Sequence, residues 1–195
     1  MTQFLPFLIS IERRNDNGID VESFVNSASC AIADRAKYKF RVVGEAKVIA
    51  ILEVQDESVV NAVTSDIMKM GPYPVICTPL TRLEWLAQLY GIRSEHIVPA
   101  PSKLSGKFVA WFEISLAKYG MTQAQVEFQW TNYAAAIFEQ RRKKEIEIDI
   151  FKVLGERRLY GFSCRGAGEE NWEHHLSKLP LGDRIYEKMK LVTNM

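Results

Sequence analysis

Residues 43–76 read VGEAKVIAILEVQDESVVNAVTSDIMKMGPYPVI, and residues 154–192 follow the same plan as LGERRLYGFSCRGAGEENWEHHLSKLPLGDRIYEKMKLV. A shift of 111 positions places Gly44 on Gly155. In each stretch a glycine turn leads into an apolar strand pattern, an amphipathic helix pattern and a second glycine turn. Two copies of one pattern with a period of about 110 residues indicate a tandem duplication.

The residues before each stretch also match. The run FLISI at 7–11 aligns with FEISL at 112–116 after a shift of 105 positions. Both halves then predict strand, helix, strand, strand, helix, strand, which is the order of ferredoxin-like βαββαβ domains. We therefore expect two repeats, 1–80 and 107–195, joined by a helical and extended linker over 81–106.

Apolar periodicity predicts the elements of each repeat. In the first repeat we expect strands and helices at 4–11, 21–35, 38–43, 47–54, 57–70 and 73–80. After a linker helix, the second repeat is expected to hold elements at 107–116, 123–144, 145–154, 157–165, 169–179 and 184–192. A four-stranded sheet covered by helices on one face leaves its other face bare. The predicted fold is therefore α+β, with the repeats forming an intramolecular dimeric α/β barrel; two independent domains on a linker are the alternative.

Composition limits the classes of partner. The formal net charge is +1 and 47% of the residues are hydrophobic, which favours neither nucleic acid nor an anionic membrane as a partner. No apolar run reaches the ~20 residues of a membrane span. Cys30, Cys77 and Cys164 have no metal-ligand spacing, so we expect buried free thiols and no metal site. The default prediction is a soluble cytoplasmic protein, with a further homo-oligomer left open.

The repeated stretch resembles muconolactone Δ-isomerase. The resemblance rests on Val43-Gly44-Glu45, on Met68-Lys69-Met70-Gly71-Pro72-Tyr73 and, in the second copy, on Leu179-Pro180-Leu181. It implies a dimeric α/β barrel and small-molecule chemistry without metal or nucleotide, in aromatic degradation or secondary metabolism. The wider superfamily also contains cofactor-independent monooxygenases and polyketide cyclases. The duplication departs from the family, and the matching segments are structural, so no catalytic residue is transferred.

The first candidate site lies on the helix expected at 169–179. Trp172, His175 and Leu179 recur at helical spacing, which places His175 on the apolar stripe and His174 beside it. A half-buried imidazole can act as a base near neutral pH. The alternative is that His175 is a satisfied core histidine.

The second candidate is Glu113, which stands in the apolar strand expected at 107–116. Desolvation there would raise the pKa of the carboxyl toward a value useful for catalysis. The alternative is an ion pair with an interior arginine such as Arg158, or a position at the barrel edge. Tyr160 could donate a hydrogen bond to the substrate.

Aromatic side chains gather in the second repeat. Together with Trp172 and His174, we expect Trp111, Trp130 and Tyr133 to bind the substrate, although an aromatic core would explain them equally. The basic run 141–144 is interpreted as a solvated helix end.

We interpret the sequence as a cofactor-independent, muconolactone isomerase-like enzyme. His175, Glu113 and Tyr160 would carry acid/base proton transfer on a lactone, enol or aromatic metabolite. One alternative is a cofactor-free monooxygenase or cyclase of a biosynthetic pathway. The other is a non-catalytic ligand-binding or scaffold barrel.

Overall fold

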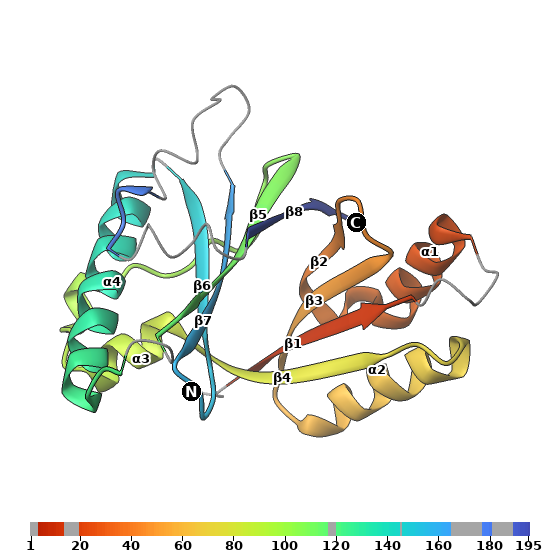
Figure 1. Ribbon diagram of the computed structural model, residues 1–195, viewed down its shortest axis with the longest axis horizontal. Coiled ribbons are helices and arrows are strands. Elements are labelled where there is room, and N and C mark those ends of the chain that lie inside the picture. The colour runs from red at the N-terminus through yellow and green to blue at the C-terminus, as the bar shows by residue number, and fades with distance from the viewer. Residues whose placement is uncertain (1–3, 14–19, 117–119, 145, 165–176, 181–188) are drawn as a thin grey trace. The chain divides into compact units, whose positions relative to one another are not determined.

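The described residues of the chain form two compact units. The computed structural model describes the chain apart from residues 1–3, 14–19, 117–119, 145, 165–176 and 181–188, which are grey in Figure 1. One unit comprises Met1–Leu80 with Val192–Met195, and the other comprises Thr81–Leu191. The described residues hold eight strands and four α-helices, so the chain is of the mixed α+β class. None of these helices is both long enough and apolar enough to span a membrane.

The first unit follows the element order expected from the sequence. It contains β1 (Leu5–Glu12), α1 (Val21–Ile32), the 3₁₀ turn η1 (Ala33–Arg35), β2 (Ala36–Val42), β3 (Lys47–Val54), α2 (Glu57–Met70) and β4 (Val75–Arg82). All pairs are antiparallel, in the order β4-β1-β3-β2, and the end of β8 (Met189–Asn194) pairs with the free edge of β2. The predicted bounds of β3 and α2 agree with the structure.

Both helices of the first unit begin at an aspartate cap. The Asp20 carboxylate accepts a hydrogen bond from the Ser23 amide at 3.0 Å, and the Asp56 carboxylate accepts one from the Ser58 amide at 2.8 Å. Each cap satisfies an amide that the first turn leaves without a helical partner. The helices cover one face of the sheet with a core that includes Ile9, Ile11, Phe24, Ala28, Ile32, Val48, Ala50, Leu52, Val63 and Ile67.

The matching glycines occupy matching turns. Gly44 has φ of 77° and Gly155 has φ of 74°, in the left-handed region that glycine adopts without a steric penalty. In both hairpins the next amide donates to the carbonyl three residues earlier, Glu45 to Val42 and Glu156 to Val153, each at 3.3 Å. The predicted hairpin turns are confirmed at both positions.

The second unit holds a three-stranded antiparallel group and two α-helices within its described residues. Its elements are α3 (Leu83–Leu89), the 3₁₀ turn η2 (Ser94–His96), β5 (Phe108–Ser115), α4 (Gln123–Lys143), β6 (Glu147–Val153) and β7 (Arg158–Cys164). The pairing order is β5-β7-β6. Most of the helix expected at 169–179, and most of the strand expected at 184–192, lies outside the described residues.

Helix α4 lies against one face of this group, with α3 beside it (Figure 1). A capping box between Thr122 and Gln125 starts α4. Apolar side chains of α3, α4 and the alternate positions of the strands form a single core, which includes Leu83, Leu86, Ala87, Ala110, Phe112, Ile114, Trp130, Tyr133, Ile137, Ile148 and Ile150. The segment expected as a linker therefore supplies part of this core through α3.

Gly161 in β7 leaves room for an aromatic ring from β5. A Cβ atom at this position would lie 2.1 Å from Cζ of Phe112 and 2.8 Å from Cδ1 of Ile150. We expect Gly161→Ala to lower the free energy of unfolding by about 1–3 kcal/mol, because the buried ring has to move. Urea unfolding measures the loss. Adding Phe112→Leu to Gly161→Ala should restore part of the lost free energy of unfolding. If the losses of the two single variants simply add in the double variant, the explanation is contradicted.

Candidate active site

Three of the predicted site residues lie together on one face of β5 and β7. Side chains alternate along a strand, so Trp111 and Glu113 face away from α4, whereas Phe112 and Ile114 belong to the core beneath it. Tyr160 is directly opposite Glu113 in the antiparallel register. Direct cross-strand neighbours have Cβ atoms about 5 Å apart, close enough for their functional groups to act on one ligand.

Arg158 connects these residues. Its Nη1 lies 3.6 Å from Oε2 of Glu113, and its Cζ lies 5.2 Å from the centroid of the Tyr160 ring. The same guanidinium contacts Glu156 at 2.8 Å through Nη2. Glu113 therefore has the arginine partner that was one alternative from the sequence. Its side chain is 14% exposed and that of Arg158 27% exposed, so the pair is only partly shielded from water.

Tyr160 is buried and offers a protonated phenol. Burial raises the pKa of Tyr160; Arg158 counteracts this in part, while Glu113 and Glu156 add to it. A hydroxyl with a raised pKa keeps its proton through the neutral range and can donate a hydrogen bond. The Trp111 ring lies 6.3 Å from the Tyr160 ring, centroid to centroid, with 46° between the planes. The face thus carries a carboxylate, a guanidinium, a phenol and an indole.

Trp130 and Tyr133 lie on the other side of the strands. Both project from α4 into the core of the second unit and are fully buried. Trp130 Nε1 and Tyr133 Oη have no hydrogen-bond partner in the described part of the chain. Burial raises the pKa of Tyr133, and the charge of Arg141 opposes the shift. The structure therefore does not bring these two residues together with Glu113 and Tyr160.

The other predicted site residues, Trp172, His174 and His175, lie outside the described residues. Within the described ranges no group of three or more His, Cys, Asp or Glu side chains could hold a metal ion.

Arg141 is the centre of a buried ionic cluster, so its assignment to a solvated helix end was wrong. Its side chain is 3% exposed and forms ion pairs with Glu84 of α3 and with Asp149 of β6, the latter at 3.4 Å. Nε also donates to the Ile148 carbonyl at 2.9 Å, and Nη1 donates to the Val98 carbonyl at 2.8 Å. Arg141 lies four residues after Ile137 and eleven after Trp130, on the buried stripe of α4, and this spacing is the signal that could have found it.

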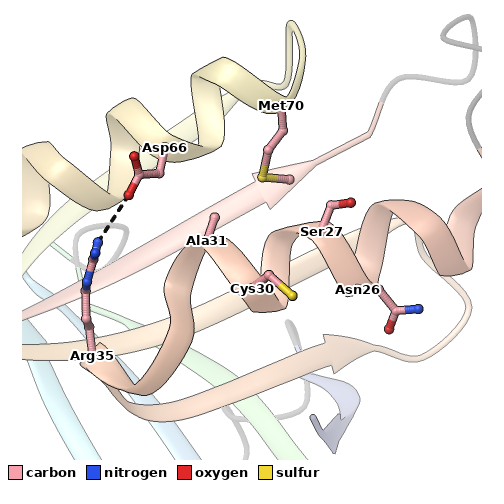
Figure 2. A pocket seen from close by; sticks show the side chains of 7 residues that line it. All are labelled: Asn26, Ser27, Cys30, Ala31, Arg35, Asp66 and Met70. Atoms are coloured by element: carbon pink, nitrogen blue, oxygen red, sulfur yellow. Dashed lines mark hydrogen bonds and ion pairs between the residues drawn. The ribbon is translucent and has the colours of Figure 1, made fainter.

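The described residues also border two open spaces. A groove of about 560 Å³ runs between α1 and α2 and is lined by Asn26, Ser27, Cys30, Ala31, Arg35, Asp66 and Met70 (Figure 2). The ion pair between Arg35 and Asp66, at 3.4 Å, crosses one end of it. A second cavity of about 370 Å³ is lined by Val98, Pro99, Pro101, Arg141, Lys144, Ile146 and Glu147. Neither is lined by Glu113 or Tyr160.

The three cysteines differ in exposure. Cys164 is buried, and its thiol donates to Oε2 of Glu147 at 3.2 Å and accepts from the Gly106 amide at 3.3 Å. Cys30 and Cys77 are exposed, so the expectation of buried thiols is confirmed for Cys164 and wrong for the other two.

We expect these thiols to differ in reactivity. Burial raises the pKa of Cys164 to about 12, so almost none of it is the reactive thiolate at pH 8. With Ellman's reagent, two thiols should react in the folded protein and the third only after unfolding in guanidinium. Peptide mapping should assign the slow thiol to Cys164, and a rapid third equivalent would contradict this assignment.

Comparison with known proteins identifies the fold. No protein-family model matches the chain, and no curated protein sequence matches it either. A variant of chlorite dismutase from Candidatus Nitrospira defluvii has a similar structure, with a TM-score of 0.57 and 10% sequence identity over 100% of this chain and 92% of that one. A candidate monooxygenase from Lactobacillus acidophilus NCFM has a TM-score of 0.57 and 10% identity over 98% and 94%. A candidate chlorite dismutase has a TM-score of 0.56 and 10% identity over 100% and 96%. The likeness shows the fold alone: the chain has an α+β fold similar to that of these three proteins.

Proposed function

We propose that the chain is a small-molecule enzyme that moves a proton on a lactone, enol or aromatic metabolite. The observation that supports this most directly is the cluster of Glu113, Arg158 and Tyr160 on one face of β5 and β7. Proton transfer beside a carbonyl needs a base for the carbon acid and a donor for the enolate oxygen. Glu113 and Tyr160 provide these groups on adjacent strands.

Each residue then has a distinct role. Glu113 takes a proton from the γ carbon of an α,β-unsaturated lactone, which the conjugated carbonyl acidifies, and Tyr160 donates a hydrogen bond to the dienolate oxygen that develops. Returning the proton to the α carbon completes a 1,3-shift with no net gain or loss of protons. Arg158 holds the Glu113 carboxylate, and Trp111 supplies a flat wall for a planar substrate. His174, His175 and Trp172 remain part of the proposal as further acid/base and binding residues. Trp130 and Tyr133 are left out of it, because they are buried in the core on the other side of the strands.

In this proposal the chain is a tandem duplication of two ferredoxin-like repeats, 1–80 and 107–195, with the segment 81–106 between them. The equal turns at Gly44 and Gly155 support a common origin. The proposal assumes no cofactor, a small-molecule substrate as the partner and a cytoplasmic location. The near-neutral charge of +1 is compatible with such a partner.

Proton exchange on a simple carbon acid tests the proposal. We expect the protein to catalyse deuterium incorporation into muconolactone, an α,β-unsaturated butenolide, and its isomerisation to the β,γ-unsaturated enol-lactone, both followed by proton NMR in D₂O. Tyr160→Phe keeps the ring and removes the donor, so the rate should fall by about 100-fold, as for loss of one oxyanion donor. A panel of butenolides and enols with no exchange above the buffer rate would reject this activity and favour the non-catalytic barrel.

Cofactor-free oxygenation is the second candidate. The likeness to the candidate monooxygenase from Lactobacillus acidophilus NCFM supports it, as does the pair of rings formed by Trp111 and Tyr160. An electron-rich dihydroxyaromatic would then be oxidised with consumption of O₂. An oxygen electrode separates the two candidates, because the proton shift consumes no O₂.

A further inference from the structure

The cavity of about 370 Å³ at the end of α4 has walls of distinct chemistry. Its volume falls in the lower part of the ~300–1,000 Å³ range of small-molecule sites. The extended segment 98–101 forms one wall, and the residues at the end of α4 and the start of β6 form the other. All lining residues belong to the second unit.

The wall formed by residues 99–101 has no amide donor to offer. Pro99 and Pro101 carry no N–H, and the Ala100 amide already donates to Oε1 of Glu84 at 2.9 Å. Backbone in this segment can therefore only accept hydrogen bonds from a ligand. Val98, Pro99, Pro101 and Ile146 provide apolar surface beside these acceptors.

The cavity is also lined by charges of both signs. Glu84 and Asp149 balance Arg141, whereas the exposed Lys144 ammonium has no ion-pair partner among the described residues. Glu147 supplies the negative charge. Burial alone would raise the pKa of Glu147. Hydrogen bonds from the Ser105 hydroxyl and amide, both at 2.6 Å, and from the Cys164 thiol at 3.2 Å, together with the charge of Lys103, bring the pKa below its ordinary value.

We propose that this cavity binds a small zwitterion, an α-amino acid with an aliphatic side chain. The carboxylate pairs with Lys144, and the ammonium faces Glu147 and the acceptor-only wall. The side chain packs against the prolines and Ile146. An anion without a positive group would be repelled by the Glu147 carboxylate, and a cation without a negative group would be repelled by the Lys144 ammonium. A ligand that carries both charges therefore suits the lining best.

Binding of leucine and of two truncated analogues tests the proposal. 4-Methylpentanoate lacks the ammonium group and 3-methylbutylamine lacks the carboxylate, while both keep the aliphatic chain. By calorimetric titration of the full chain, leucine should bind at least about tenfold more tightly than either analogue. Equal affinity for 4-methylpentanoate or 3-methylbutylamine, or no binding of leucine up to about 20 mM, would overturn the proposal.

Lysine variants place the ligand in the cavity. Lys144→Met should weaken leucine binding at least about tenfold without changing the melting temperature, because Lys144 is exposed. Lys143→Met is the matched control, since Lys143 pairs with Glu139 at 3.5 Å and does not line the cavity. Lys144→Arg should retain binding. Leucine binding that survives Lys144→Met would show that the ligand binds elsewhere.

Discussion

Replacing Arg141 by methionine should lower the free energy of unfolding by about 3–5 kcal/mol, the usual cost of removing one partner from a buried ion pair. Glu84 and Asp149 would then be left with no cation between them, and the side chain of Asp149 is 1% exposed. The Ile148 and Val98 carbonyls would also lose their donors. Methionine fills much of the same volume, so the loss reports mainly on the charge and its hydrogen bonds.

Urea unfolding of the Arg142→Met variant provides the matched control. Arg142 is the next residue of α4 and pairs with Glu139 at 2.6 Å, but about half of each side chain is exposed. Such exposed pairs contribute about 0–1 kcal/mol. Arg141→Met combined with Asp149→Asn should recover part of the loss, because the second change removes a buried negative charge that has lost the Arg141 cation. Equal effects of the two arginine variants would show that Arg141 is not a buried ionic centre in solution.

Glu113→Gln should lower the rate of proton exchange by about 1,000-fold, within the range for loss of a general base, or about 4 kcal/mol in the activation free energy. The amide has nearly the same shape as the carboxylate but cannot accept the substrate proton. Because Glu113 is partly exposed and paired with Arg158 at 3.6 Å, the variant should fold normally. The rate is read by proton NMR in D₂O with muconolactone.

Glu156→Gln is the control for the charge of the cluster. Glu156 also pairs with Arg158, at 2.8 Å, but its side chain is half exposed and lies in the hairpin turn. We expect its exchange rate to stay within about twofold of the unsubstituted protein, since it takes no part in proton transfer. If the exchange rate falls by a similar factor in both variants, the effect comes from the altered surroundings of Arg158. Glu113 would then not be the base.

Local patterns predicted most of the secondary structure. The bounds of β3 and α2 agree with the prediction because an apolar run, an aspartate cap and a glycine stop all mark the same positions. The hairpins at Gly44 and Gly155 agree because their backbone needs a residue that accepts positive φ. Caps and turns of this kind are determined by a few neighbouring residues, so the surrounding fold has little influence on where they form.

The environments of individual side chains were harder to predict. Arg141 looked like one member of an exposed basic run, but its partner Glu84 lies 57 residues earlier in the chain. The exposure of Cys30 and Cys77 likewise depends on how neighbouring elements cover them. For the site, Glu113, Tyr160 and Trp111 could be grouped from strand alternation and register. Trp130 and Tyr133 could not be separated from them, because an aromatic residue on an apolar helix face fits a core and a pocket equally well.

The space at Gly161 also acts as a marker of strand register. The Phe112 ring fits only opposite a residue without a side chain, and the same-face neighbours in β7 are Leu159 and Ser163. A slip of two residues would keep every side chain on its proper face, so hydrophobic patterning alone does not prevent it. It would, however, place a leucine or a serine where the ring has to lie. The contact between Gly161 and Phe112 thus fixes the register of β5 and β7. It keeps Glu113 opposite Tyr160 and disfavours the registers shifted by two residues.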